Sequence, residues 1–331
     1  MKHILTKMFD HQSLNRTEAA EILTKIASGE YSNEQIASFI TVYLMRPITM
    51  EELLGFRQAL LEMALKVDLS EFNPIDIVGT GGDGKNTFNI STLSCLVLAG
   101  AGFKVAKHGN YGATSVSGAS NVLEYFGAKF TTDISKIKTS MDKAGFSFLH
   151  APLFNPAMKS VAPIRKSLGV RTFFNVMGPL ISPVKPNYQV LGVYSLTMLR
   201  LYNYICQHLG MNYTLLHSLD GYDEVSLTAD TKVITGTRED VLSPSAMGFP
   251  TFLQEELSGG ETIDDAAKIF MNVLENKATT PQQAVVLANS AFAIQTLQPE
   301  MPFEEAKNIA KESIISGEAK KAFKNFLVIY Q

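Results

Sequence analysis

The sequence has few cysteines, no cluster of basic residues and no long apolar run, and each absence excludes a class of protein. Its only cysteines are Cys95 and Cys206, which lack CxxC spacing. Two such thiols are typical of reduced, structural residues in a cytosolic protein, and no zinc site is indicated. Lysine and arginine are scattered and the net charge is −3, so the basic footprint of a dedicated nucleic-acid binder is missing.

The apolar segments also argue against a membrane protein. The longest such run, Leu93–Phe103, is too short to span a bilayer, and Met1–Gln12 is too polar for a signal peptide. We therefore expect a cytoplasmic protein with no membrane partner. With 331 residues, 46% hydrophobic and 18% charged, the chain is long enough for one large domain and a small one.

The first part of the chain has a helical pattern, from Leu14 to about Val67. Capping boxes at Ser32 and Thr49 mark two helix starts, and Gly29 stands where a glycine would close the first helix. One apolar face, which we interpret as core rather than as a ligand site, comprises Ile36, Phe39, Ile40, Tyr43 and Leu44.

From Ile75 onward, short β-rich runs alternate with helical ones. The predicted strands are Ile75–Val78, Lys104–Ala106, Lys129–Phe130, Phe146–Leu149 and Val190–Tyr194. Helices at 90–102 and 117–126 would connect the first strands, which predicts a mainly parallel sheet with helices on both faces and ligands at the carboxyl ends of its strands. Three or four helices follow Thr262.

We therefore predict an α/β protein with a small helical domain and a larger α/β domain. The helical domain spans residues 1–70 and is completed by a partly helical return segment at about 156–185. The α/β domain takes the rest of 71–331.

A glycine-rich stretch, Gly79–Lys85, links the first predicted strand to a helix start. Its glycines Gly81, Gly82 and Gly84 permit positive φ and a close approach of the backbone to an anion, while N–H groups of the helix start point outward. The stretch predicts a phosphate-binding turn. The alternative is a structural turn before a buried helix.

Two nucleotide-binding fingerprints match the glycine pattern of this stretch but not the flanking residues that each requires. The dinucleotide fingerprint needs an acidic residue about 20 positions further on, where the chain has Lys104–Lys107. The nucleoside-triphosphate loop needs Ser or Thr after its lysine, and Asn86 follows Lys85. The context excludes both.

Two further loops carry groups suited to phosphate and metal. Lys107–Ser120 follows the second predicted strand and combines a cation, hydroxyls and glycines, which suits more phosphate oxygens; a flexible surface loop is the alternative. Asp223 and Glu224 follow a predicted strand at Leu215–His217. Adjacent carboxylates favour magnesium that also binds substrate phosphates, and an acidic surface turn is the alternative.

Together these segments resemble the anthranilate phosphoribosyltransferase family, which joins anthranilate to phosphoribosyl diphosphate. The resemblance runs from the first helices to the last. It is carried by Gly79–Asp83, Asn89–Thr92, Lys107–Asn110, Ser117–Gly118, Ala151–Lys159, Arg165, Leu168–Thr172, Asn175–Leu180 and Asp220–Glu224.

The resemblance implies a helical and an α/β domain as in pyrimidine nucleoside phosphorylases, a site between them, and a homodimer. It implies that phosphoribosyl diphosphate is bound by Gly79, Gly82, Asp83, Thr87, Asn89, Ile90, Ser91, Thr92, Lys107, His108, Gly109, Asn110, Tyr111, Gly112, Ala113, Thr114, Ser115 and Ala119. Anthranilate would face Gly79, Asn110 and Arg165. Of two Mg²⁺ ions, one would be shared by Ser91 and Glu224 and the other held by Asp223 and Glu224.

The chain departs from the family at Tyr111, Val116 and Ala119, where the family commonly has Arg, Lys and Ser. No residue is assigned as a catalytic acid or base, because diphosphate is a good leaving group once its charge is neutralised. The alternatives are a nucleoside phosphorylase, which does not need the paired carboxylates, and a nucleic-acid-binding relative, which should have a basic surface.

Overall fold

The computed structural model describes residues 1–112 and 115–331, which form two compact units. The helical unit comprises Met1–Val67 and Ala151–Lys185, and the α/β unit comprises Asp68–His150 and Pro186–Gln331. Each unit is therefore built from two separate stretches of chain. Among the described residues, no helix combines the length and the apolar character that crossing a membrane requires.

The helical unit consists of short helices whose starts are fixed by side-chain caps. Its elements are α1 (Lys2–Phe9), α2 (Arg16–Ala27), α3 (Asn33–Met45), α4 (Met50–Met63), α8 (Ala151–Phe154), α9 (Ala157–Leu168) and the 3₁₀ turns η2 (Phe173–Val176) and η3 (Gly178–Leu180). The predicted capping boxes at Ser32 and Thr49 are confirmed. Gly29 has φ +79° just after α2, as a terminating glycine requires.

The core of this unit is a cluster of aromatic rings. Phe39, Tyr43 and Phe56 pack edge to face, and Phe173, from the return segment, stacks on Phe56 at 4.7 Å. The face predicted to be core is confirmed except for Leu44, which is 44% exposed. Helix α1 was not predicted, because Met1–Gln12 is largely polar and only Met8 of this helix is buried.

The α/β unit is built on one seven-stranded sheet in the order β3-β2-β1-β4-β5-β6-β7. Its strands are β1 (Ile75–Gly79), β2 (Val105–Gly109), β3 (Phe146–His150), β4 (Tyr188–Gly192), β5 (Asn212–Ser218), β6 (Thr231–Thr235) and β7 (Glu239–Leu242). The first five strands are parallel, and the two that follow are antiparallel. The predicted mainly parallel sheet is confirmed.

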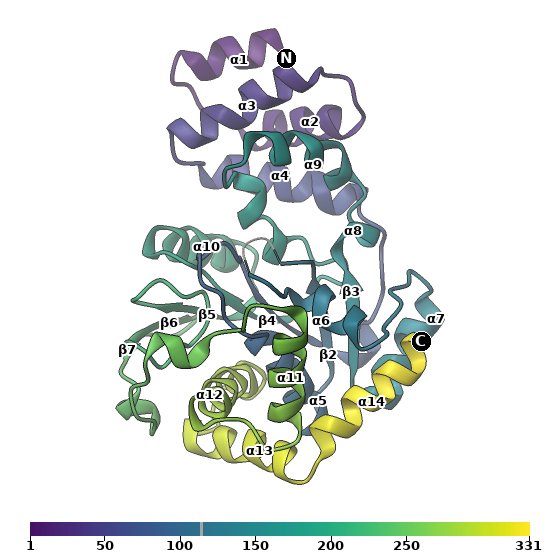
Figure 1. The fold of residues 1–331 in the computed structure, drawn as a ribbon. Coiled ribbons are helices and arrows are strands. Elements are labelled where there is room, and N and C mark those ends of the chain that lie inside the picture. The colour runs from purple at the N-terminus through teal and green to yellow at the C-terminus, as the bar shows by residue number, and fades with distance from the viewer. Residues whose placement is uncertain (113–114) are drawn as a thin grey trace. The chain divides into compact units, whose positions relative to one another are not determined.

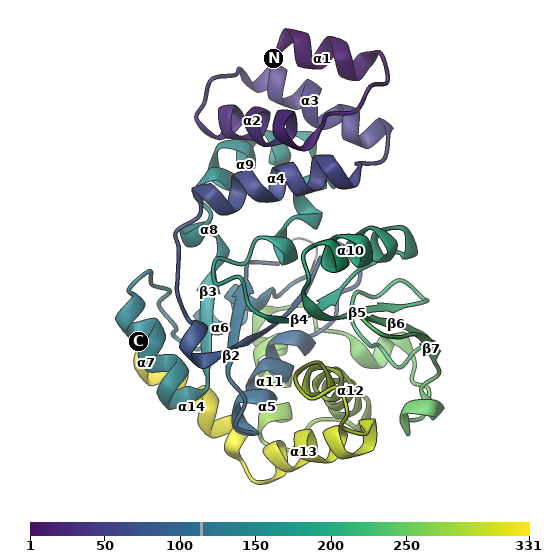
Figure 2. The same cartoon turned by 180° about the vertical axis from the view of Figure 1, so that it is seen from behind.

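Helices cover both faces of this sheet, with α10 on one face and α5 and α12 on the other (Figures 1 and 2). They are α5 (Ile90–Gly100), α6 (Ala119–Tyr125), α7 (Ile134–Ala144), α10 (Leu196–His208), α11 (Ile263–Leu274), α12 (Thr280–Leu297), α13 (Phe303–Ile315) and α14 (Glu318–Tyr330). Three 3₁₀ turns complete the unit: η1 (Ser70–Phe72), η4 (Ser245–Met247) and η5 (Gln254–Leu257). Three or four helices were expected after Thr262, and the structure has four, α11 to α14.

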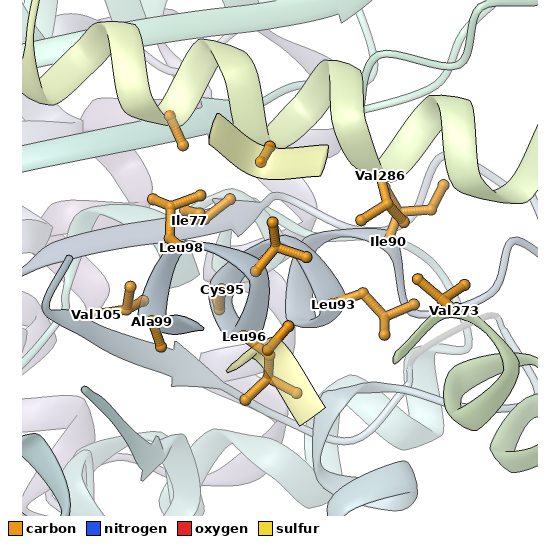
Figure 3. Close-up of a cluster of buried hydrophobic side chains, with 14 of the residues drawn as sticks. Ile77, Ile90, Leu93, Cys95, Leu96, Leu98, Ala99, Val105, Val273 and Val286 are labelled. Carbon is orange, nitrogen blue, oxygen red and sulfur yellow. The ribbon is translucent and has the colours of Figure 1, made fainter. Parts of the chain in front are cut away.

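The core of the α/β unit lies around α5, which is apolar on all sides. Leu93, Leu96 and Leu98 of this helix are fully buried and pack with Ile77 of β1 and Val286 of α12 (Figure 3). A helix without a polar face must be enclosed by other elements. The start of α5 is thereby held firmly at the end of β1.

Two strand predictions need correction, and two strands were not predicted. Lys129–Phe130 is not a strand, because the Lys129 N–H donates to the Tyr330 carbonyl at the end of α14, at 2.6 Å, instead of joining a ladder. The strand predicted at Val190–Tyr194 lies two residues earlier, at Tyr188–Gly192 (β4). The antiparallel pair β6 and β7 was not predicted.

Candidate functional site

The loops at the carboxyl edge of the sheet contain most of the predicted site residues. Strand β1 lies between β2 and β4, so the connections that follow β1 and β4 leave in opposite directions along the sheet. Ligands in open α/β sheets bind at such a switch point. Three loops gather there: the glycine loop (Gly79–Asn86), the loop between β2 and α6, and the carboxylate loop (Leu219–Glu224).

The glycine loop adopts the backbone predicted for it. Gly81, Gly82 and Gly84 have φ of +64°, +73° and +76°, a region in which other residues are strained. The loop leads into α5 through Asn89, whose amide donates to the Ser117 carbonyl at 3.0 Å. The first two loops are therefore tied together at their bases.

Two glycines make room for Asp223. A Cβ on Gly79, at the end of β1, would overlap the Asp223 carboxylate, and a Cβ on Gly192, at the end of β4, would overlap the Asp223 backbone carbonyl. The carboxylate accepts a hydrogen bond from the Gly81 N–H at 2.6 Å. Asp223 is thus seated between the ends of two neighbouring strands, against the glycine loop.

Glu224 reaches the start of α5, where its Oε1 accepts the Ser91 N–H at 2.9 Å. A carboxylate is favourable at a helix N-terminus. Burial nevertheless raises the pKa of both Asp223 and Glu224, and repulsion between these carboxylates and that of Asp83 raises each further. Burial also raises the pKa of Asp83. Three acidic groups therefore lie close enough to repel one another, which is an arrangement that a cation stabilises.

Two polar side chains, those of Ser218 and Asn289, bind the backbone at the end of the carboxylate loop. Ser218 donates its hydroxyl to the Glu224 carbonyl at 2.7 Å. Asn289, on the buried helix α12, bonds both backbone groups of Val225, at 3.1 Å to its N–H and 2.9 Å to its carbonyl. The position of Glu224 is therefore set by the core of the unit.

Lys107 is buried rather than displayed on its loop. The side chain is 3% exposed, and its ammonium donates to the Ile77 carbonyl at 2.6 Å and to the Ser91 hydroxyl at 3.3 Å. This position differs from that of a lysine that faces the phosphates directly, which its predicted place in the loop after the second strand suggests. Instead, it lies beneath β1 and the start of α5, where its charge also favours the ionised forms of Asp76 and Glu224.

The loop between β2 and α6 is closed at its neck by Asn121. Its Oδ1 accepts the N–H groups of Gly112 and Gly118, each at 3.0 Å. Tyr111 donates to Glu124 at 2.8 Å, and its ring lies edge-on to His150 at 5.0 Å. The predicted residues Ala113 and Thr114 lie outside the described part of the chain.

The other residues predicted to bind phosphoribosyl diphosphate differ in how exposed their side chains are. Ile90 and Thr92 are almost completely buried, and Ile90 belongs to the core (Figure 3). His108 is buried in β2, whereas Asn110 and Gly112 are exposed. Among the members of the set that the structure describes, the more accessible polar residues offer side chains to a ligand without a change of conformation. They are Asp83, Thr87, Ser91, Asn110, Tyr111 and Ser115.

Arg165 belongs to the helical unit, on α9. Its guanidinium lies 5.7 Å from the centre of the Phe174 ring, and burial lowers its pKa. Within residues 1–112 and 115–331 it forms no ion pair with a carboxylate. A half-buried arginine stacked on a ring remains charged and suits an anionic partner.

Two residues that shape the site, Gly192 and Asn289, were missed by the sequence reasoning. Gly192 lies within a predicted strand, where a glycine signals a close approach of another backbone, and this signal was available. Asn289 lies in an apolar helix and gives no local signal of its partner, which is 64 residues away.

Comparisons with known proteins agree with this architecture. Residues 2–64 match the family described as "Glycosyl transferase family, helical bundle domain", and residues 71–320 match "Glycosyl transferase family, a/b domain". The two matched ranges cover most of the chain.

Similar whole proteins carry one name. Anthranilate phosphoribosyltransferase of Bacteroides thetaiotaomicron is 58% identical over 99% of this chain and 98% of its own. The Thermus thermophilus enzyme superposes with a TM-score of 0.91 at 31% identity, covering 98% of both chains. The Saccharomyces cerevisiae enzyme, solved in complex with PRPP and Mg, gives 0.89 at 31% identity over 96% of this chain and 93% of its own. The chain belongs to the anthranilate phosphoribosyltransferase family.

Proposed function

We propose that the three loops at the carboxyl edge of the sheet bind phosphoribosyl diphosphate for its transfer to anthranilate, a step of tryptophan biosynthesis. The observation that carries this proposal is that the carboxylate loop contacts both the glycine loop and the start of α5. Asp223 bonds the Gly81 N–H and Glu224 bonds the Ser91 N–H. Backbone N–H groups, glycines and acidic groups thus meet where a magnesium diphosphate would lie.

The binding residues are proposed to be those predicted from the sequence. Those that the structure describes are Gly79, Gly82, Asp83, Thr87, Asn89, Ile90, Ser91, Thr92, Lys107, His108, Gly109, Asn110, Tyr111, Gly112, Ser115 and Ala119. The buried members of the set contribute backbone groups or support, as Lys107 does under Ser91.

The acidic residues fit magnesium. Three mutually repelling carboxylates and the Ser91 hydroxyl supply oxygen ligands, which Mg²⁺ prefers. In the part of the chain that the structure describes, no three His, Cys, Asp or Glu side chains are grouped so that they could hold a metal ion by themselves. Mg²⁺ usually takes further oxygen ligands from substrate phosphates and water, and we propose that phosphoribosyl diphosphate completes the site in this way. The complex of the yeast relative supports the use of this metal, and we propose two ions, one held by Ser91 and Glu224 and one by Asp223 and Glu224.

The reaction requires positioning more than proton transfer. The anthranilate nitrogen forms a bond to C1 of the ribose, the bond from C1 to the diphosphate oxygen breaks, and the nitrogen releases a proton. When bound, magnesium neutralises charge on the departing diphosphate. The glycine loop and Ser91 orient the diphosphate, and the Lys107 ammonium adds a fixed positive charge beneath it.

One assay tests the proposed function. Loss of anthranilate fluorescence is expected when phosphoribosyl diphosphate and magnesium are both added to the purified protein, and not when either is omitted. Nucleosides with phosphate serve as the control for phosphorylase activity. Turnover of nucleosides without loss of anthranilate would overturn the assignment.

We also propose that the protein is cytoplasmic and that it forms a homodimer. Light scattering at working concentrations tests the homodimer.

For Arg165→Ala we expect a KM for anthranilate raised about tenfold or more, because a charged hydrogen bond contributes about 1.5–3 kcal/mol. The KM for phosphoribosyl diphosphate should change little. Lys166→Ala, one residue further along α9 and exposed, is the matched control. Equal increases in both constants would contradict a role confined to the anthranilate carboxylate.

For Tyr111→Arg we expect less than about a tenfold change in kcat/KM, which is about 1.4 kcal/mol. An arginine at this place can still pair with Glu124, and an exposed charge adds about 0–1 kcal/mol. Tyr125→Arg, at a tyrosine of similar exposure, 49% against 44%, is the control. A change of several hundredfold in either direction would show that Tyr111 itself decides substrate binding.

A further inference from the structure

Lys85 is the cation of the glycine loop, and the site described so far gives it no role. Its ammonium lies 4.5 Å from the centre of the Tyr222 ring and 3.1 Å from Gln254 Oε1. A Cβ built on Gly221 would have Lys85 Cε as its nearest neighbour, at 4.0 Å. The side chain therefore extends from the glycine loop onto the carboxylate loop.

The contact continues through Gln254 back to the carboxylate loop. Its amide nitrogen donates to Asp220 Oδ2 at 3.1 Å, and Thr228 donates to the same oxygen. Lys85, Tyr222, Gln254 and Asp220 thus form a closed set of contacts, which we call the Lys85 clasp. It joins three segments that are far apart in sequence.

The clasp stands beside the acidic groups of the site. Asp83 lies two residues before Lys85 and accepts the Lys85 backbone N–H at 3.0 Å, and Tyr222 immediately precedes Asp223. We propose that Lys85 is a positioning residue that holds the glycine loop and the carboxylate loop at the spacing required for magnesium diphosphate. This inference rests on the function proposed above.

The contacts of the Lys85 clasp are expected to stabilise the spacing of these loops more than an exposed ion pair would. Surface ion pairs contribute little because water and salt screen them. Here, the Tyr222 ring is 3% exposed, so the ammonium lies on a ring face that is largely withdrawn from water. A cation over such a face, with an added hydrogen bond, is expected to shift binding by about fivefold to tenfold.

The test compares Lys85→Met with Lys311→Met, at an exposed lysine on α13. Methionine keeps the length of the side chain and removes its charge. We expect Lys85→Met to raise the KM for phosphoribosyl diphosphate and the magnesium concentration for half-maximal rate by about fivefold to tenfold. The KM for anthranilate and the melting temperature should stay as in Lys311→Met. Lys85→Arg should restore most of the loss, because guanidinium also binds aromatic faces.

A double-mutant cycle separates a clasp from direct contact with substrate. Gln254 is exposed, so Gln254→Met should fold, and we expect it to raise the same two constants. Adding it to Lys85→Met should have little further effect if both act through the clasp. Fully additive losses, a silent Gln254→Met or a Lys85→Met that matches Lys311→Met would each overturn the clasp. Absence of anthranilate turnover in the unmodified protein would overturn the proposed function instead.

Discussion

Replacing Asp223 with Asn and Glu224 with Gln is expected to lower kcat/KM at least about 1,000-fold, or about 4 kcal/mol. The amides keep the size and the hydrogen-bond acceptors of the carboxylates, so the bonds to the Gly81 and Ser91 N–H groups can persist. They remove the negative charge that a divalent cation requires. Stopped assays over a range of magnesium concentrations measure the effect, and excess magnesium should not restore the rate.

Stability distinguishes this loss from unfolding. Burial and mutual repulsion raise the pKa of both carboxyls above their ordinary values, so ionising them in the folded protein is unfavourable. The folded state therefore loses stability as pH rises from about 4, where unfolded carboxyls ionise, through the raised values. The double variant should melt no lower than the unmodified protein at pH 8 without magnesium.

The control is the variant Glu261→Gln with Glu300→Gln, which removes two exposed charges and should keep the normal rate. Normal rates in the Asp223→Asn, Glu224→Gln variant would refute the metal assignment.

Gly192→Ala is expected to reduce kcat/KM about 100-fold or more, because a displacement of about 1 Å at a site can cost that much. The new Cβ would occupy the place of the Asp223 carbonyl, so the carboxylate loop must move away from the end of β4. Gly192 does not have a positive φ, so the effect is steric. Overpacking of this kind destabilises by about 1–3 kcal/mol, and the melting temperature should fall.

Gly236→Ala is the matched control for this substitution. Gly236 lies between β6 and β7, and a Cβ added there meets no atom within 4 Å. It should leave both rate and melting temperature unchanged. If Gly192→Ala were equally silent, the close approach of Asp223 to β4 could not be a requirement of the site.

The fold was predictable where the chain repeats a strong local pattern. Strand β1, the glycine loop and helix α5 could be predicted, because two apolar runs are separated there by a glycine-rich stretch. The strand predicted at Lys129–Phe130 was wrong because two residues, of which only Phe130 has a high β propensity, are too few to form a strand, and because the Lys129 N–H donates to a distant carbonyl, that of Tyr330. Strands β6 and β7 were missed because alternation in such short, charged segments is weak.

The candidate site was predictable to the extent that its groups lie in contiguous motifs. The glycines of the glycine loop and the acidic pair could be proposed as site residues for this reason, and the positive φ angles predicted for the loop are confirmed. The burial of Lys107 was not foreseen, because it depends on which side of β2 faces α5. The support from Asn289 depends on a contact made only after the sheet and α12 have packed.

The return segment has a consequence for the order in which the chain can fold during synthesis. Helix α9 packs against α2, α3 and α4, and Phe173 completes their aromatic cluster. The ribosome must therefore add the whole stretch from Asp68 to His150 before the first helices acquire their last partner. During that interval the amino-terminal helices have an incomplete core, and the first three strands await β4, which pairs directly with β1. Neither unit can be completed independently as a continuous piece of chain, so excision at a single boundary would leave each with exposed apolar surface.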